Sequence, residues 1–279
     1  MSIILAADGP RTSPWSVGAT FRGVRRHALT STYLSLLVAI PLLALGTHAL
    51  RGGPGAWWSA VTQREALLAI GLTLGCALVA TAINVVMGFL AAWVLVRDNF
   101  RGHALLNAVI DVPFALPTVV AGVTFMTLYG PMSPLHLSLA GTWIGISVAL
   151  LFVTFPFCVR AVQPVLESLT WTAEQASESL GATPWQTLRH ITFPALAPAI
   201  AAGAGLALAR AVGEFGSVVF ISGNRPFHTE VASAYIFMLS QSQNFDAAAG
   251  VSLALMLIAL GLLIIVRMLA QRVSREQAS

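Results

Sequence analysis

The stretch Thr170–Pro194, TWTAEQASESLGATPWQTLRHITFP, is the only long polar segment in the second half of a very apolar chain. Its pattern predicts two short helices folded about a glycine. Thr172, followed three residues later by Gln175, has the spacing of a capping box that starts the first helix. Gly181 then ends that helix, because glycine adopts the left-handed conformation beyond a helix end at little cost.

The second helix of this segment is predicted to begin just after Thr183. Gln186 completes another capping box, and Pro184 occupies the first helical position, where its missing N–H costs nothing. Pro194 and the proline four residues beyond it predict that the helix ends near Ile191. One face of the first helix carries small residues and one leucine, which lets another surface approach the backbone closely. The residues on this face are Ala173, Ala176, Ser177 and Leu180.

The segment resembles the EAA loop of ABC importer permeases. Gln175-Ala176-Ser177 stands where that family has Glu-Ala-Ala, and the spacing from glycine to the final proline is intact. Glu174 lies one position early, and Phe193 replaces a leucine. The resemblance implies a loop that docks on an ATPase subunit and couples nucleotide-driven closure to the membrane domain; an amphipathic cytosolic connector is the alternative. The docking residues that it implies are Glu174, Gln175, Ala176, Ser177, Gly181, Ile191 and Pro194.

Composition places the chain in a membrane. Hydrophobic residues make up 57% of the 279 residues and charged residues only 9%, with a mean hydropathy of +0.80, whereas soluble domains carry about 25% charged residues. All 15 basic residues are arginine. A phosphate-binding P-loop requires a lysine, so we predict that ATP is bound and hydrolysed by a partner subunit and that this chain is not itself an enzyme.

The reactive side chains form no recognisable catalytic or metal-binding constellation. The sequence has neither H-E-x-x-H nor G-x-S-x-G, and its six histidines are scattered. Cys76 and Cys158 lie in apolar runs and are predicted to be buried free thiols. We therefore predict no catalytic, cofactor-binding or metal-binding residues. The pI near 9.8 reflects arginines that flank apolar runs, which indicates contact with lipid headgroups rather than with nucleic acid.

Apolar runs predict six transmembrane helices. The first is preceded by arginines and resembles a secretory signal in that respect, but its apolar run is longer than such a signal needs, so we interpret it as a retained helix. The second exceeds the roughly 20 residues that cross a bilayer. The predicted spans are 28–50, 66–97, 112–129, 141–160, 195–221 and 247–266. The predicted organisation is a largely disordered cytosolic tail 1–28, a first helix and external loop 29–64, a core 65–270 with the docking loop 166–195, and a cytosolic tail 271–279.

Three loop features refine these spans. Gly130–Pro134 contains two prolines and a glycine and breaks the long apolar run into two spans. Asp111, with Pro113 close behind, is predicted to cap the start of the third span, and a role in substrate handling is a second interpretation of Asp111. The polar external loop 222–246 is predicted to hold a short helix near residues 232–239.

The arginines predict the orientation. With six spans both termini lie on one side, and arginines mark the cytosolic side. Eleven arginines fall on the side of the termini and of the docking loop, and three on the other. The first group is Arg11, Arg22, Arg25, Arg26, Arg97, Arg101, Arg160, Arg189, Arg267, Arg272 and Arg275, and the second is Arg51, Arg64 and Arg225.

Two further stretches, 111–118 and 210–224, resemble the sulfate/thiosulfate permeases, and the continuation Thr229–Ser233 resembles their T-type subunit. The resemblance implies a type I ABC importer permease fold with cytosolic coupling helices, in the bacterial inner membrane. It implies an ATPase dimer, a second related permease, and a periplasmic or lipid-anchored sulfate-binding protein as partners. Since the Gly-Glu-Phe-Gly element also occurs in molybdate permeases, a molybdate or tungstate permease is an alternative. A secondary anion transporter is a second alternative, although we find no internal repeat of the kind that secondary transporters carry.

Arg210 and Glu214 are the only charges well inside a predicted span. Their i, i+4 spacing puts them on one helix face, where they can pair. Such residues usually face a bundle interior or an aqueous cavity. One interpretation is a neutralised pair that holds helices together. The other is a translocation path in which Arg210 assists a divalent oxyanion, Glu214 weakens its retention and Ser217 offers a hydrogen bond.

Overall fold

The computed structural model describes residues 16–169 and 171–275, and the side-chain packing of residues 31–169 and 174–268. These residues form helices joined by short loops, with no strand among them, which confirms the predicted all-α class. The chain divides into two parts, residues 1–47 and 48–279. The first part contributes most of α1 (Ser16–Ala49). Residues 16–28 are therefore helical and do not belong to a disordered tail, while residues 1–15 lie outside the described residues.

Long apolar helices account for the predicted spans. Five described helical segments are long and apolar enough to cross a membrane, and a sixth span results if a bent pair is counted as one. The bent pair is α4 (His103–Ala115) with α5 (Thr118–Tyr129). The others are 31–49 of α1, α3 (Arg64–Arg97), α6 (Trp143–Ser168), the continuous segment 184–212, which ends with α9 (Phe193–Val212), and 245–268 of α12 (Phe245–Arg275).

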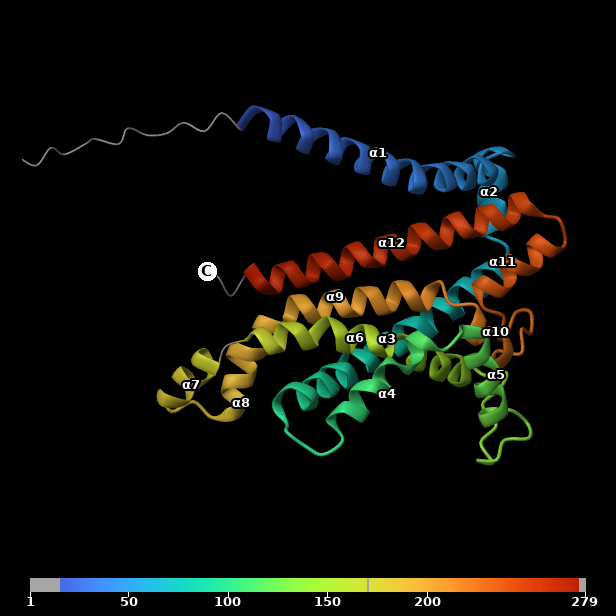
Figure 1. Ribbon diagram of the computed structural model, residues 1–279. Helices are drawn as coiled ribbons and strands as arrows, with labels where there is room; N and C mark the ends of the chain where they lie inside the picture. Colours follow the sequence, from blue (N-terminus) through green and yellow to red (C-terminus); the bar gives the residue numbers. More distant parts are fainter. Residues whose placement is uncertain (1–15, 170, 276–279) are drawn as a thin grey trace, which may run out of the picture. The chain divides into compact units, whose positions relative to one another are not determined.

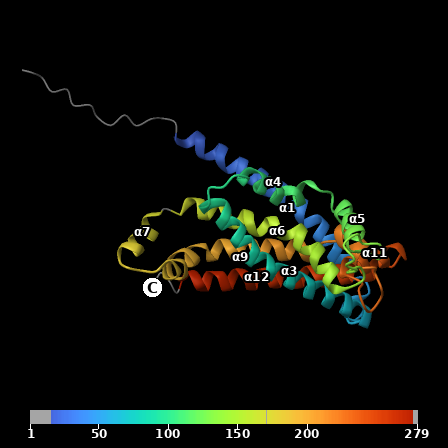
Figure 2. The same ribbon diagram turned by 90° about the horizontal axis from the view of Figure 1, so that it is seen from below.

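Four of these helices, α3, α6, α9 and α12, run side by side and form the core of the second part (Figures 1 and 2). Small residues permit the close approach. A Cβ atom placed on Gly88 would lie 2.6 Å from the Cβ of Cys158, and one on Gly203 would lie 3.0 Å from the Cβ of Ala161. Helices in lipid associate through such close contacts because the bilayer supplies no hydrophobic driving force. Cys76 and Cys158 are buried free thiols, as predicted.

One buried side-chain amide forms hydrogen bonds between two helices of this core. The Asn84 Nδ2 group of α3 donates to the carbonyl oxygen of Leu151 at 3.0 Å and to Thr154 Oγ1 at 2.9 Å, both on α6. Asn84 is almost completely buried. A buried amide without partners would be costly, so these bonds restrict the register in which α3 and α6 pack.

The third span is bent, which the sequence interpretation missed. Asp111 and Pro113 lie inside α4, which begins at His103, so the prediction that Asp111 caps a helix start is wrong. The helix instead ends before Pro117, where Leu116 has an extended ψ of 123°, as expected for a residue that precedes proline. α5 then leaves at 108° to α4.

At the end of the bundle that contains α5, the loops carry short helices (Figure 1). α2 (Gly53–Val61) lies in the loop after α1 and was not predicted; its Trp57 Nε1 donates to the Gly250 carbonyl oxygen of α12 at 3.1 Å. α11 (Ala232–Gln241) confirms the short helix predicted near residues 232–239. The break at Gly130–Pro134 is also confirmed, because α5 ends at Tyr129.

Candidate functional site

The polar segment forms a compact helical hairpin at the opposite end of the bundle (Figure 1). α7 (Trp171–Ser179) is followed by Leu180 and Gly181, and the Gly181 φ of +87° is the predicted left-handed conformation. The Gly181 N–H bonds to the Glu178 carbonyl at 2.9 Å, and the next N–H bonds back to Ser177, which is the Schellman arrangement. α8 (Pro184–Thr187) follows, and Thr183 and Gln186 form the predicted capping box.

Two local predictions about the hairpin are wrong. Thr172 lies within the first turn of α7 and not at its cap, because the helix already begins at Trp171. The second helix does not end near Ile191. It passes through a π turn, Leu188–Thr192, directly into α9, with Pro194 as the second residue. The wider π turn changes which carbonyl each N–H meets, so proline enters the helix without ending it.

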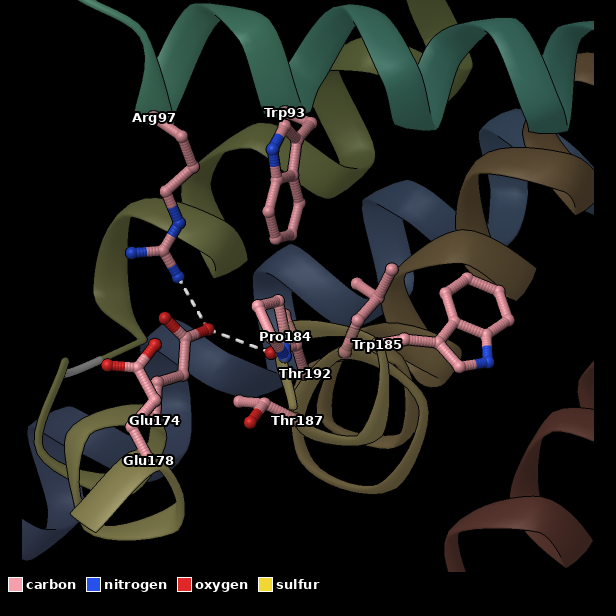
Figure 3. Close-up of a pocket in the computed structure, with 9 residues that line it drawn as sticks. Trp93, Arg97, Glu174, Glu178, Pro184, Trp185, Thr187 and Thr192 are labelled. Atoms are coloured by element: carbon pink, nitrogen blue, oxygen red, sulfur yellow. Dashed lines mark hydrogen bonds and ion pairs between the residues drawn. The ribbon is translucent and has the colours of Figure 1, made fainter. Parts of the chain in front are cut away.

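Glu174 ties the hairpin to the core. Its Oε1 accepts from Arg97 Nη2 at 2.8 Å and from Thr192 Oγ1 at 2.8 Å, which joins α7, the end of α3 and the π turn (Figure 3). Both charged side chains are largely buried. The Arg97 guanidinium also lies 5.6 Å from the centre of the Trp93 ring. Charge-assisted bonds of this kind are roughly twice as strong as neutral ones, so Glu174 holds α7 against α3.

A cavity of about 380 Å³ opens between the hairpin and α3. Figure 3 shows Trp93 and Arg97 on one side, Glu174 and Glu178 on another, and Trp185 opposite them. The remaining lining residues are Pro184, Thr187, Leu188 and Thr192. Trp185 and Leu180 are strongly exposed, Leu180 to 89%.

The docking residues inferred from the sequence divide into two groups. Gln175, Ala176 and Gly181 are exposed and available to a partner. The others hold the hairpin together: Ser177 Oγ bonds to Thr187 Oγ1 at 3.0 Å, and Glu174 bonds to Arg97 and Thr192. Ile191 and Pro194 are half-buried where the hairpin enters the bundle.

The second candidate site is a break in the predicted fifth span. α9 ends at Val212, and α10 (Gly216–Ile221) begins after a turn, so the span is not continuous to residue 221. Arg210 pairs with Glu214 across this turn, as their spacing predicts. Glu214 Oε1 also accepts the Ser217 N–H at 2.8 Å. The Glu214 side chain is 1% exposed and that of Arg210 is 34% exposed, so the carboxylate is buried while the arginine side chain is partly accessible.

Ser217 lies where α10 packs tightly on α5. Its side chain is fully buried, and its hydroxyl has no hydrogen-bond partner among the described residues. A Cβ atom on Gly122 of α5 would lie 2.6 Å from the Gly216 carbonyl oxygen, and one on Gly216 would lie 2.2 Å from Thr118 Oγ1. The two helices therefore meet backbone to backbone beside Ser217.

A third cluster was missed by sequence reasoning. Arg160 was assigned to the cytosolic end of the fourth span, but α6 continues to Ser168. Arg160 Nε and Nη2 donate to the two carboxylate oxygens of Asp111, Nη1 donates to the side-chain oxygens of Asn107 and Gln163, and Nη2 also donates to the Asn107 carbonyl. All five N–H donors of a guanidinium are thereby used. A carboxylate and an arginine 49 positions apart carry no local signal of such pairing.

A buried carboxyl lies near α11, away from the hairpin. Glu230 is 6% exposed, and its Oε2 atom has no hydrogen-bond partner among the described residues. Burial raises the pKa of Glu230 above its ordinary value, and the negative charge of Glu65 raises it further. Nearby, the Tyr235 hydroxyl contacts Gln63 Oε1 at 3.3 Å. In the described part of the chain, no three His, Cys, Asp or Glu side chains are placed to hold a metal ion.

Long apolar helices, with a capped hairpin beyond them and ion pairs inside them, define a multi-pass membrane protein. A family model described as binding-protein-dependent transport system inner membrane component matches residues 84–275. The chain belongs to this family, and it is a multi-pass permease subunit of the inner membrane.

Known proteins resemble the chain over most of its length. The sulfate transport system permease protein CysT of Escherichia coli (strain K12) is 40% identical over 251 residues, covering 88% of this chain and 91% of that protein. The protein with the same name in Synechocystis sp. (strain ATCC 27184 / PCC 6803 / Kazusa) is 39% identical over 250 residues, covering 87% of each. A bacterial ABC transporter involved in alginate import has the same fold, with a TM-score of 0.73 at 17% identity, covering 91% of this chain and 99% of that one.

Proposed function

We propose that this chain is the T-type permease subunit of an ATP-driven importer that carries sulfate or thiosulfate across the inner membrane. The observation that carries the proposal is the 40% identity to a sulfate transport permease over 88% of the chain. The named relatives favour sulfate over molybdate or tungstate. Membership in a binding-protein-dependent family also favours an ATP-driven importer over a secondary anion transporter.

The test is uptake of labelled sulfate by cells that lack their own sulfate importers. The cells express this chain together with the proposed ATPase, second permease and sulfate-binding protein. We expect uptake that stops when the ATPase is inactivated by mutation. Uptake that continues, driven by an ion gradient, would contradict the importer and support a secondary transporter. Uptake of molybdate without sulfate would contradict the proposed substrate.

The α7–α8 hairpin is the proposed docking surface for the ATPase. Gln175, Ala176 and Gly181 offer exposed polar and small groups, and Leu180 and Trp185 add exposed apolar area. Such a mixture fits a protein partner, since interfaces are enriched in aromatic anchors surrounded by polar groups. Glu174 is proposed to transmit movement of the docked hairpin to α3, because it bonds to Arg97 directly.

Arg210, Glu214 and Ser217 are the proposed translocation path. Arg160 and Arg210 each pair with a carboxylate, and Arg160 has all five donors engaged. Arg210 has no hydrogen-bond or ion-pair partner besides Glu214 among the described residues, and its side chain is partly accessible. A guanidinium with unused donors can meet an anion, and a saturated one cannot. Arg160 is therefore assigned a structural role between α4 and α6.

Both termini and the hairpin are proposed to face the cytosol. Arg160 no longer counts toward the charge asymmetry because it lies within α6, and ten arginines remain on the cytosolic side against three on the other. The asymmetry supports the same orientation as the docking role of the hairpin.

Cysteine labelling tests this orientation. In a background that lacks Cys76 and Cys158, we expect Met132→Cys to react with an impermeant thiol reagent in whole cells and Gln186→Cys to react only after the membrane is opened. Both positions are exposed, Met132 to 95%, so access to the thiol does not differ between them. The reverse labelling pattern would overturn the orientation.

A further inference from the structure

We propose that Glu214 is a tethered oxyanion that occupies the binding site of the transported anion, and that the anion displaces its carboxylate during transit. This inference rests on the proposed function and names the groups that hold the substrate. It also assigns Glu214 a direct part in transport, as the competitor for the positive charge that the substrate needs.

The two carboxylate oxygens of Glu214 interact with two separate hydrogen-bond donors. Oε2 pairs with the Arg210 guanidinium, and Oε1 accepts the backbone N–H of Ser217 at 2.8 Å. A sulfate ion also presents anionic oxygen acceptors, and guanidinium groups bind both kinds of oxyanion through paired N–H groups. The contacts of Glu214 are therefore those that a sulfate ion would make at this place.

Donors beyond those used by Glu214 remain. Arg210 is 34% exposed and has no other partner among the described residues. The Ser217 hydroxyl is fully buried and also lacks a partner there. A buried hydroxyl without an acceptor is unfavourable, and few such groups occur in native proteins. An oxyanion has four oxygens where a carboxylate has two, so it can accept from this hydroxyl while it binds Arg210.

The charges explain why the anion is not retained. Arg210 with Glu214 is neutral overall. A divalent anion beside Arg210 leaves an excess negative charge, and the displaced Glu214 carboxylate adds a second one close by. Like charges repel strongly in a medium of low dielectric constant, and conduction requires binding that is weak enough to permit release. Glu214 then returns to Arg210 as the anion leaves.

The test is equilibrium retention of labelled sulfate by the purified permease–ATPase complex without binding protein. Glu214→Gln keeps the size of the side chain and removes its charge. We expect this variant to retain sulfate at least tenfold more tightly than wild type while its transport rate falls. Arg210→Gln combined with Glu214→Gln is expected to lose both retention and transport.

Asp111→Asn is the matched control, because Asp111 is the other membrane carboxylate paired with an arginine. It is expected to retain no more sulfate than wild type. Equal retention by wild type and Glu214→Gln would overturn the proposal. The proposal would also be overturned if Asp111→Asn retained as much sulfate as Glu214→Gln, because any arginine that loses its carboxylate partner would then bind sulfate. Normal transport by the neutral double variant would show that the charge is not needed.

Ser217→Ala keeps the proposal testable if Glu214→Gln does not assemble. The lost hydroxyl has no partner among the described residues, so the complex should assemble normally. We expect its sulfate transport rate to fall severalfold, and an unchanged rate would overturn the role of the hydroxyl as an anion donor. If the wild-type complex transports no sulfate, the proposed function fails. If it does transport sulfate and the variants behave like wild type, this inference alone fails.

Discussion

A Gly181→Val variant is expected to insert into the membrane normally and to lose transport. Gly181 has a φ of +87°, and a Cβ atom there would meet nothing within 4 Å. Any destabilisation of the hairpin by this substitution therefore comes from the backbone conformation alone. A β-branched residue forced into this region is strained by about 1–3 kcal/mol, which the hairpin relieves by misplacing α7 relative to α8. We expect weakened association with the ATPase in co-purification and loss of sulfate uptake.

Two glycine variants provide the controls. Gly181→Asn should behave like wild type, because asparagine tolerates the left-handed conformation far better than valine. Gly75→Val places the same side chain in open space on helix α3, where no positive φ is required, and should also transport. Normal transport by Gly181→Val would favour the alternative that the segment is an amphipathic connector with no coupling role.

An Arg97→Gln variant is expected to produce the largest loss of stability at the hairpin. The Glu174 side chain is 12% exposed, and its carboxylate accepts from Arg97 and Thr192. Removing the positive charge leaves a largely buried carboxylate, and breaking a buried pair in this way costs about 3–5 kcal/mol. We expect a lower thermal unfolding midpoint for the purified protein and faster proteolysis within residues 171–192.

The double variant Arg97→Gln with Glu174→Gln should recover much of this loss. Two amides can still hydrogen-bond and leave no buried charge. Glu167→Gln, which changes an exposed carboxylate on α6, should have an effect of less than about 1 kcal/mol. If Arg97→Gln alone is as stable as wild type, Glu174 is not held by Arg97, and the proposed transmission from the hairpin to α3 loses its physical basis.

Local features of the chain were predictable from sequence. The capping box at Thr183 and Gln186 and the left-handed Gly181 each depend on residues a few positions apart, so neighbouring side chains determine them. The bounds of α3 followed from a long uncharged run between charges. The pairing of Arg210 with Glu214 was predicted from their spacing, although the two residues do not lie on one helix, because α9 ends at Val212.

Other features depend on contacts between distant segments. α6 continues beyond Arg160, whose guanidinium binds Asp111 and Asn107 on α4, and a charged residue with partners need not end a span. The helix continues through Pro194 because a π turn precedes it. The contacts of Glu174 also depend on distant segments. Its proximity to the EAA-like triplet predicted docking, which stays a prediction, and the structure adds bonds to Arg97 and Thr192.

The sequence by itself determined that this protein crosses the membrane several times, and it located the polar hairpin. Hydropathy, capping and glycine conformation act over short stretches of chain, so they are visible without a fold. Only the tertiary structure decided which arginine has unused N–H donors. Arg160 is saturated and Arg210 is not, and that difference arises from side chains brought together by helix packing.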